Sequence, residues 1–135
     1  MIQTEGLCKL YRGRNNEETR AVDDVSITIP AGRLVVLTGP SGSGKTTLLS
    51  LLGTLSRPTS GNITMDGQSL HACSDVELAR VRRNIGFVFQ NFSLMSRLSV
   101  WENVTYPLIP RGVIPAARYD IARQVLEKLG MLGKI

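Results

Sequence analysis

Two runs of residues along the chain are apolar almost without interruption. Residues 34–37 read Leu-Val-Val-Leu and residues 85–89 read Ile-Gly-Phe-Val-Phe. Each run is too short for a soluble helix, and such runs are typical of strands that are buried on both faces of a parallel sheet. We therefore expect two parallel strands. Gln90 follows the second one, at the carboxyl end, where ligands bind in sheets of this kind.

Other segments alternate between apolar and polar residues, which predicts strands with one wet face. Residues 2–11 have the mixed pattern of an edge strand, with Gly6 as a candidate bulge. A polar loop is expected over residues 12–20, and Val22–Ile29 then alternates regularly. A short strand over residues 62–65 ends in an Asp-Gly turn. Together these segments predict a small antiparallel sheet beside the parallel strands.

Helices are predicted where apolar residues recur at helical spacing behind a recognisable start. One opens near Gly44 and carries four leucines between residues 48 and 52. Three others begin at the capping boxes Ser74-x-x-Glu77 and Ser99-x-x-Glu102 and at Pro115. The last of these is expected to end at Gly130, since glycine is the usual residue just beyond a helix.

Between the first apolar run and the first helix, the chain reads Gly-Pro-Ser-Gly-Ser-Gly-Lys-Thr-Thr over residues 39–47. Gly-x4-Gly-Lys-Thr between a strand and a helix is the pattern of a phosphate-binding loop. A glycine-rich turn with no ligand is the alternative. However, the motif arises by chance in on the order of one chain in a hundred of this length, and its context fits. We expect phosphate contacts from Gly39, Pro40, Ser41, Gly42, Ser43, Gly44, Lys45, Thr46 and Thr47.

The residue types of this loop suggest individual roles. Glycines allow a tight turn whose N–H groups point inward, and the start of the helix adds its positive dipole end. Lys45 is expected to reach the β- and γ-phosphate oxygens as a point charge. The Thr46 hydroxyl is placed to ligate the Mg²⁺ that bridges these phosphates, and Thr47 is expected at the α-phosphate. The sequence therefore predicts a site for Mg-ATP or a similar polyphosphate.

Composition and charge exclude few classes of protein. The chain has 135 residues, 42% of them hydrophobic, which is enough for one core, and a formal net charge of +5. The excess charge is scattered without a run of five like charges, so a solvated surface explains it better than nucleic acid does. Cys8 and Cys73 are far apart and are expected to be plain thiols. No apolar run approaches 18 residues and no signal peptide is evident, so we expect a cytoplasmic protein.

Four stretches of the sequence together resemble the ATP-binding subunits of ABC transporters. They are the phosphate-binding loop, Pro-Thr-Ser-Gly at 58–61, Ile-Gly-Phe-Val-Phe-Gln-Asn-Phe-Ser-Leu at 85–94 and Glu-Asn-Val at 102–104. The resemblance covers nearly the whole chain. With Pro107-Leu108 and Arg111-Gly112-Val113, it looks most like the branch that serves lipoprotein release and macrolide export.

The resemblance implies roles for residues that the loop motif does not include. Tyr11 looks like the aromatic platform on which adenine stacks, with Val22 bracing the base. Gln90 looks like the glutamine that contacts Mg²⁺ and the attacking water, which makes it a candidate catalytic residue together with Lys45. Residues 91–98 look like the face that receives a membrane-spanning permease. A second nucleotide-binding domain, a position on the inner face of the membrane and no nucleic-acid partner are implied as well.

Several family motifs are not found in these 135 residues. There is no Leu-Ser-Gly-Gly-Gln signature, no apolar strand ending in Asp-Glu, and no switch histidine, since His71 precedes Gln90. We therefore expect an α/β P-loop NTPase core with an antiparallel β subdomain beside a partial parallel sheet, truncated before the signature. Residues 1–95 would form the ATP-binding core and residues 96–135 the start of a helical subdomain.

The expected activity is that of an ABC-type ATPase, although the 135 residues alone are expected to bind ATP with little or no hydrolysis. Two other classes fit the loop motif. A soluble ABC protein acting on nucleic acid or ribosomes would show salt-dependent binding to DNA or RNA. A small P-loop kinase would share the loop, but the resemblance at Tyr11 and at the 87–90 segment argues against it.

Overall fold

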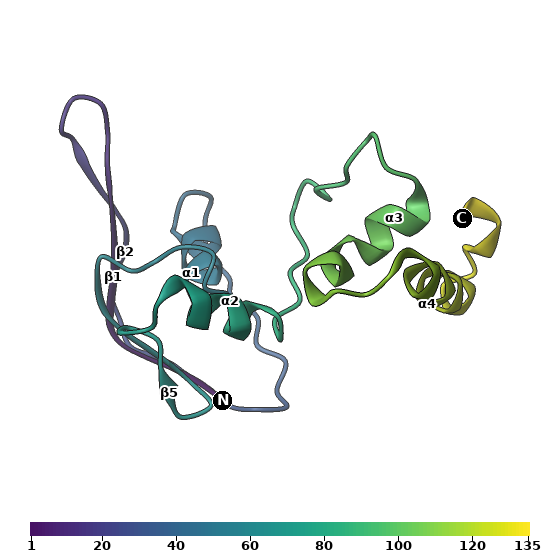
Figure 1. Ribbon diagram of the computed structural model, residues 1–135. Coiled ribbons are helices and arrows are strands. Elements are labelled where there is room, and N and C mark those ends of the chain that lie inside the picture. Colours follow the sequence, from purple (N-terminus) through teal and green to yellow (C-terminus); the bar gives the residue numbers. More distant parts are fainter. The chain divides into compact units, whose positions relative to one another are not determined.

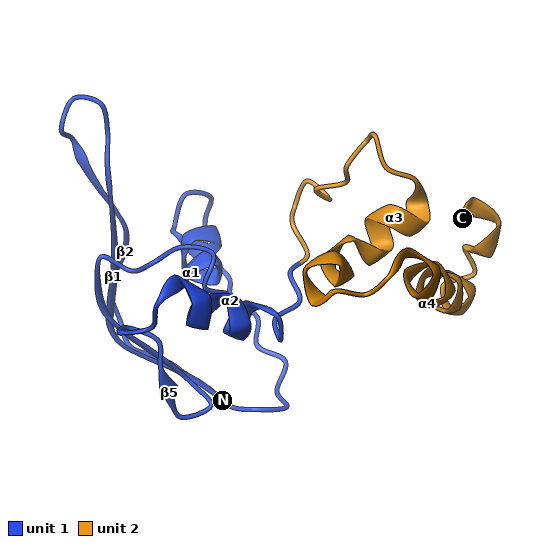
Figure 2. Cartoon of the chain, viewed as in Figure 1, with its two compact units in different colours: residues 1–87 blue, residues 88–135 orange.

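The computed structural model describes all residues from 1 to 135, and the chain divides into two compact units. Unit 1 comprises residues 1–87 and unit 2 comprises residues 88–135, coloured blue and orange in Figure 2. The sequence predicts a boundary a little later in the chain, after residue 95, between the ATP-binding core and the helical subdomain. Each unit has its own packing and is described separately.

Unit 1 is built on an antiparallel sheet around one long strand, β1 (Ile2–Arg12) (Figure 1). The strand order is β2-β1-β4-β5, and β3 also pairs with β1. The other strands are β2 (Glu18–Val25), β3 (Thr28–Ile29), β4 (Ser60–Met65) and β5 (Gln68–Ser69). Every pairing is antiparallel, which confirms the antiparallel sheet expected from the alternating segments.

The predicted bulge at Gly6 is present. The register between β1 and β4 shifts between Glu5 and Cys8, and Gly6 has a φ of 56°. A β-carbon added to Gly61 on β4 would lie only 2.3 Å from the carbonyl oxygen of Gly6. The two strands can approach this closely because Gly61 carries no side chain.

The first hairpin extends further than the sequence suggested, and the strand expected over Val22–Ile29 is broken. β1 reaches Arg12 and β2 starts at Glu18, so the loop is confined to residues 13–17, and the Arg12 guanidinium lies 3.2 Å from the Glu18 carboxylate.

The Thr4 hydroxyl donates to the carbonyl of Val25 at 2.9 Å and accepts from the N–H of Ile27 at 3.0 Å. This buried side chain satisfies the backbone where β2 ends and β3 has not yet begun.

Two helices pack on this sheet, as predicted. α1 (Lys45–Leu52) follows the glycine-rich loop, and α2 (Asp75–Arg82) begins at Ser74 with both hydrogen bonds of the predicted capping box. A single buried cluster joins the two helices to the sheet. It contains Leu7, Val22, Leu48, Leu51, Leu52, Ile63, Leu70, Cys73 and Leu78.

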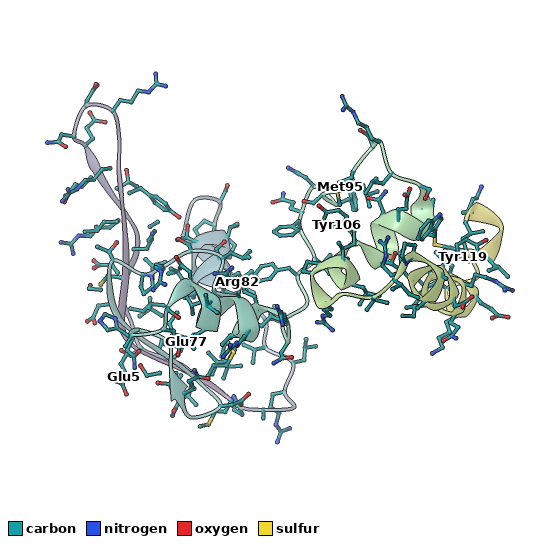
Figure 3. The ribbon with its side chains drawn as sticks, viewed as in Figure 1. Glu5, Glu77, Arg82, Met95, Tyr106 and Tyr119 are labelled. Atoms are coloured by element: carbon teal, nitrogen blue, oxygen red, sulfur yellow. The ribbon has the colours of Figure 1, made fainter.

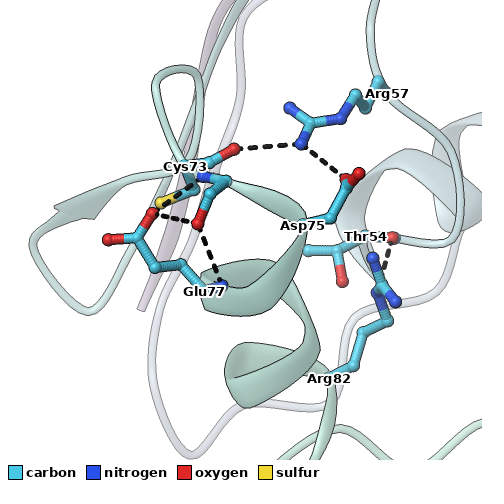
Figure 4. A network of polar contacts seen from close by, with 7 residues as sticks. Thr54, Arg57, Cys73, Asp75, Glu77 and Arg82 are labelled. Atoms are coloured by element: carbon cyan, nitrogen blue, oxygen red, sulfur yellow. Dashed lines mark hydrogen bonds and ion pairs between the residues drawn. The ribbon is translucent and has the colours of Figure 1, made fainter.

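Polar contacts fasten α2 to the segment that follows α1 (Figure 4). The Arg57 guanidinium donates to the carbonyl of Cys73 at 3.0 Å and to the Asp75 carboxylate at 2.9 Å, and this hydrogen bond and charge lower the pKa of Asp75. Nε of Arg82 donates to the carbonyl of Thr54 at 3.1 Å. The connection between α1 and β4 is therefore held from both ends of α2.

The regular structure of unit 2 is helical and begins at residue 100. The helices are α3 (Val100–Thr105), the 3₁₀ helix η1 (Tyr106–Arg111), α4 (Pro115–Lys128) and the short 3₁₀ helix η2 (Leu132–Lys134). α3 packs on α4 through an edge-to-face contact of Trp101 with Tyr119, with ring centroids 5.5 Å apart, and Ala122 and Leu126 are buried. The capping box at Ser99, the start at Pro115 and the turn at Gly130, with φ of 66°, agree with the sequence.

The two predicted parallel strands do not form, and this part of the expected fold is wrong for the chain as it stands. Neither residues 34–37 nor residues 85–89 belong to a strand, and the sheet contains no parallel pair. Leu34 is 94% exposed and Val88 is 96% exposed. A parallel strand needs hydrogen bonds to at least one neighbouring strand, and none of the five strands present pairs with residues 34–37 or 85–89.

No helix in the structure combines the length and the apolar character that crossing a membrane requires.

Candidate phosphate-binding site

The glycine-rich loop turns directly into α1, and close contact with β2 holds it in place. Gly44 is the N-cap of α1 and has a φ of 84°, in the left-handed region that glycine tolerates best. A β-carbon at Gly44 would lie 2.0 Å from the carbonyl oxygen of Ala21. The loop thus packs backbone to backbone against β2, and only glycine fits at this position.

Lys45 reaches back over the loop from the first position of α1. Its ammonium group donates to the carbonyls of Gly39 at 2.8 Å and Pro40 at 2.6 Å, and it lies 3.2 Å from the hydroxyl of Ser43. All three acceptors are neutral oxygens of the loop itself. The positive charge of Lys45 is therefore held at the loop without a counter-ion, where a phosphate oxygen would make a stronger, charge-assisted bond.

A hollow of about 520 Å³ lies beside the loop, between it and β2. An exposed ion pair, Arg20 to Asp23 at 3.0 Å, lies at this hollow and adds polar groups to it. The remaining lining residues are Ala21, Val22, Val25, Leu37, Thr38, Gly39, Pro40, Gly42, Ser43, Gly44, Lys45 and Leu48. The hollow is lined by apolar side chains together with backbone groups of the loop and the charged groups of Arg20, Asp23 and Lys45, a mixture that is typical of small-ligand sites.

Backbone donors at the start of α1 fit an anion. The N–H of Ser43 donates to Pro40, and the first N–H of α1 that donates to a backbone acceptor is that of Leu48, bonded to Gly44 at 2.8 Å. The N–H groups of the first helical turn are thus left without intrahelical acceptors, and the helix dipole adds positive potential there. These donors, the ammonium group and the glycine backbone fit a polyphosphate, and the hydroxyl of Thr46 on the same turn fits a Mg²⁺ bound to it.

The structure brings together only part of the predicted site. Val22 lines the hollow with the loop, and only 5% of it is exposed. Tyr11, near the end of β1, does not line the hollow and is 45% exposed. Its ring centroid lies 5.3 Å from the ammonium group of Lys9. Gln90 is an exposed turn residue of unit 2, whereas the loop belongs to unit 1.

Some residues at the site belong to no recognisable sequence motif. The carbonyl of Ala21 and the ion pair of Arg20 with Asp23 come from β2, about twenty residues before the loop. Only the antiparallel pairing of β2 with β1 and its packing on α1 bring them to the hollow. The steric constraint at Gly44 could not be predicted beyond the fact that the residue is a glycine, since the sequence does not show that the backbone of Ala21 lies beside it.

Comparison with known proteins agrees with this geometry. The sequence pattern of the ABC transporter family matches residues 22–134. An uncharacterized ABC transporter ATP-binding protein from Bacillus subtilis, YknY, is 40% identical over the full chain, which covers 59% of that protein. The lipoprotein-releasing system ATP-binding protein LolD from Chromohalobacter salexigens is 41% identical over 97% of the chain and 55% of its own length. The chain therefore spans little more than half the length of these relatives.

A solved structure shares the fold. The ATP-binding cassette MJ0796, in a dimeric post-hydrolysis state bound to ADP and Pi, superposes with a TM-score of 0.83 at 38% identity. The match covers 94% of this chain and 56% of that one. The α/β cassette fold expected from the sequence is thereby confirmed at the level of the family. With the loop geometry, the sequence match and the structural match in agreement, the chain belongs to the ABC transporter family.

Proposed function

We propose that this chain is the Mg-ATP-binding part of an ABC transporter ATPase that powers export or lipoprotein release through a membrane permease. The observation that carries the proposal is the loop from Gly39 to Gly44. Its backbone is packed against β2, the charge of Lys45 is held on neutral loop oxygens, and a hollow opens beside it. Such an arrangement binds a polyphosphate through backbone N–H groups and one movable cation.

Binding then proceeds by an exchange of acceptors. When phosphate oxygens enter the hollow, the Lys45 ammonium leaves the carbonyls of Gly39 and Pro40 and donates to anionic oxygens instead. The contact of Gly44 with the carbonyl of Ala21 involves no atom of Lys45, so this end of the loop stays attached to β2 during the exchange. Mg²⁺, when bound, would neutralise part of the negative charge on the phosphates. The hydroxyl of Thr46 would hold it, and the family resemblance alone proposes Gln90 as a further ligand.

The remaining roles are proposals supported by the resemblance and the relatives. Tyr11 stacks on adenine, Val22 braces the base, and Gln90 orients water and signals occupancy to the permease. The solved neighbour is a dimer and LolD serves lipoprotein release, which support a second copy and an exporting permease as partners. The protein would then lie peripherally on the inner face of the membrane.

The residues for turnover are not all among these 135. The sequence contains neither the Leu-Ser-Gly-Gly-Gln signature nor an apolar strand ending in Asp-Glu. Since phosphoryl transfer depends on positioning and charge stabilisation, we expect this stretch by itself to bind Mg-ATP and to hydrolyse it slowly. The family assignment removes the small P-loop kinase as an alternative. A soluble ABC protein would instead show salt-dependent binding to RNA or DNA.

The proposal is tested at Lys45. Lys45→Ala removes the ammonium group that bonds to Gly39, Pro40 and Ser43 of the loop, so Mg-ATP affinity should fall by about a hundredfold or more, as for the loss of a charge-assisted contact. Calorimetry on wild type and variant measures it. Lys128→Ala, in the last turn of α4, is the control and should bind as wild type. Unchanged affinity in Lys45→Ala would show that the loop is not the nucleotide site.

A further inference from the structure

Unit 1 contains a second pocket, of about 200 Å³, which shares no lining residue with the hollow beside the phosphate-binding loop. Its walls come from α1, α2, β4 and the residues that follow these elements. Four of its apolar lining residues are buried, namely Leu51, Ile63, Leu70 and Leu78. An apolar cavity of about 150 Å³ holds one benzene molecule, so this pocket has room for a single ring with small substituents.

Thr54 adds to this pocket a polar group for which the chain has no partner. Thr54 lines the pocket, is only 7% exposed, and its hydroxyl is buried without a hydrogen bond. A ligand that bonds to such a hydroxyl relieves the penalty of burying it unpaired. A φ of 58° is also strained for a β-branched residue, and strained residues cluster at ligand sites.

The backbone of Thr54 is held in place on both sides. Its N–H donates to the carbonyl of Leu51 at 3.0 Å, and its own carbonyl accepts from Nε of Arg82, the α2 residue that Figure 3 labels. The position of Thr54 at the pocket is therefore fixed, and its hydroxyl is the group left unsatisfied.

Nitrogen donors lie where the pocket opens to solvent. Arg57 and His71 line the pocket and are exposed, in contrast to the buried Thr54. Only Nη2 of Arg57 is bonded, to the carbonyl of Cys73 and the carboxylate of Asp75 (Figure 4). Nε and Nη1 of Arg57 keep their N–H groups available, and a guanidinium binds a carboxylate through two such donors. No acidic residue lines the pocket, so an anionic group is favoured at its mouth.

We propose that this pocket is a second ligand site, which binds a small aromatic monocarboxylate with a hydroxyl at the far end of its ring. The carboxylate bonds to Arg57 and His71 at the mouth, and the ring packs on the buried apolar residues. The hydroxyl of the ligand pairs with the hydroxyl of Thr54. The pocket has the composition of a small-molecule site, an apolar lining with a few polar groups that fix the orientation.

The probe is 4-hydroxybenzoate, compared with benzoate, which lacks the hydroxyl, and with 4-hydroxybenzamide, which lacks the charge. Binding to the full-length protein is measured by calorimetry and by the methyl NMR shifts of Leu51, Ile63, Leu70 and Leu78. We expect saturable binding of 4-hydroxybenzoate with a Kd of about 1 mM or tighter, and shifts of these methyl groups. Each analogue should bind about tenfold more weakly, since each leaves one polar group of the pocket without its partner.

Thr54→Val removes the hydroxyl and keeps the β-branched shape. Because this hydroxyl is unpaired in the folded chain, the variant should unfold at a temperature about 2 °C higher than wild type. It should also bind 4-hydroxybenzoate no more tightly than benzoate. Thr105→Val is the matched control, since the Thr105 hydroxyl is buried but donates to the carbonyl of Trp101 at 2.7 Å. It should not raise the unfolding temperature, and it should bind both compounds as wild type does.

The mouth of the pocket is tested separately. Arg57→Gln should weaken 4-hydroxybenzoate binding by about tenfold or more, as for the loss of a charge-assisted bond. Since Arg57 also holds Cys73 and Asp75, the exposed His71→Ala provides a milder variant, with an expected loss of about threefold. Lys45→Ala should bind 4-hydroxybenzoate as wild type does, because its ammonium group belongs to the other hollow.

Three results would overturn the proposal. The first is the absence of saturable binding up to about 10 mM 4-hydroxybenzoate, or binding without shifts of the four lining methyl groups. The second is a Thr54→Val variant that still prefers 4-hydroxybenzoate to benzoate by the wild-type factor. The third is loss of binding in Lys45→Ala, which would place the carboxylate at the phosphate-binding loop instead.

Discussion

Two loops of this chain are shaped by opposite means. The loop at Gly39–Gly44 is shaped by its backbone: three glycines have positive φ, of 151°, 80° and 84°, and one of them lies against the carbonyl of Ala21. The loop at residues 91–99 is shaped by a side chain, the amide of Asn103, which bonds to backbone groups of Met95, Leu98 and Ser99. Each shape suits a different kind of ligand.

The difference shows which groups of each loop, backbone N–H groups or side chains, remain available to contact a ligand. When glycines alone make the turn, the backbone N–H groups stay free and can surround an anion. When an amide from a neighbouring helix takes up the backbone groups, the loop's own side chains are left to point outward, as Phe92 and Leu94 do. The first loop offers backbone donors of the kind that bind an anion, and the second offers exposed apolar side chains.

The largest expected effect is at Gly44. Gly44→Ala would place a β-carbon 2.0 Å from the carbonyl oxygen of Ala21 at a φ of 84°, so backbone as well as side chain must shift. We expect a loss of about 3 kcal/mol in the free energy of unfolding, from left-handed strain and overpacking together. Guanidinium denaturation followed by circular dichroism measures it.

Gly42→Ala is the matched control in the same loop. Its φ is 80°, but no atom lies within 4 Å of the added carbon, so only the left-handed strain of about 1 kcal/mol is expected. If the two variants lose equal stability, the contact with β2 does not hold the loop.

A smaller effect is expected at Tyr11, which tests whether the nucleotide site extends beyond the hollow that the first loop lines. Tyr11→Ala should weaken binding by about 1 kcal/mol, because a ring that stacks on a base contributes this much in other systems. ATP and GTP should weaken together, since the face of an aromatic ring tolerates either base. Calorimetry with both nucleotides measures this. Tyr119→Ala in unit 2 is the control. If ATP and GTP bind Tyr11→Ala as tightly as they bind wild type, Tyr11 is not part of the nucleotide site.

The second loop should respond to acid through Glu102. Hydrogen bonds from the hydroxyl and the backbone N–H of Ser99 lower the pKa of Glu102 from its ordinary 4.5. The carboxylate form is favoured in the folded state, so this stabilisation is complete above pH 4.5 and is lost as the pH falls through the lowered pKa. The protection factors of the α3 amides, which are corrected for the intrinsic pH dependence of exchange, should therefore fall on acidification.

Glu102→Gln provides the control for this titration. Exchange in α3 should be faster than in wild type near neutral pH and should lose the part of the acid response that belongs to Glu102. A wild-type protein whose α3 exchanges with the same acid dependence as Glu102→Gln would show that the carboxylate does not stabilise the start of this helix.

The smallest effect is expected from making the second loop more like the first. Phe92 and Ser93 have φ of 57° and 49°, in the region where a residue with a side chain is strained. Ser93→Gly relieves that strain but loosens the unfolded chain, so the net gain in stability should be only a few tenths of a kcal/mol. Thermal unfolding measures it, with Ser41→Gly as control. A clear destabilisation would mean that the Ser93 side chain has a contact of its own.

Much of unit 1 could be predicted from local pattern. The capping box at Ser74, the start of α1 at the glycine-rich loop and the bulge at Gly6 are each decided by residues within a few positions, so the sequence carries their signal. The break between β2 and β3 could not be predicted, because it depends on the Thr4 hydroxyl, which comes from another strand. The parallel strands were predicted wrongly, since an apolar run becomes a strand only beside suitable neighbours.

The sequence by itself determined the family of this protein and predicts its chemistry. The order of glycines, Lys45 and Thr46 specifies a phosphate-binding loop, and the same residues with Gln90 indicate the family, because these requirements are local and depend on residue type. Tertiary structure alone decided that Ala21 closes on Gly44, that Val22 lines the hollow while Tyr11 does not, and that Asn103 holds Met95. Each of these contacts depends on how separate segments pack and bond in space, and no spacing along the chain encodes which backbone group a side chain will meet.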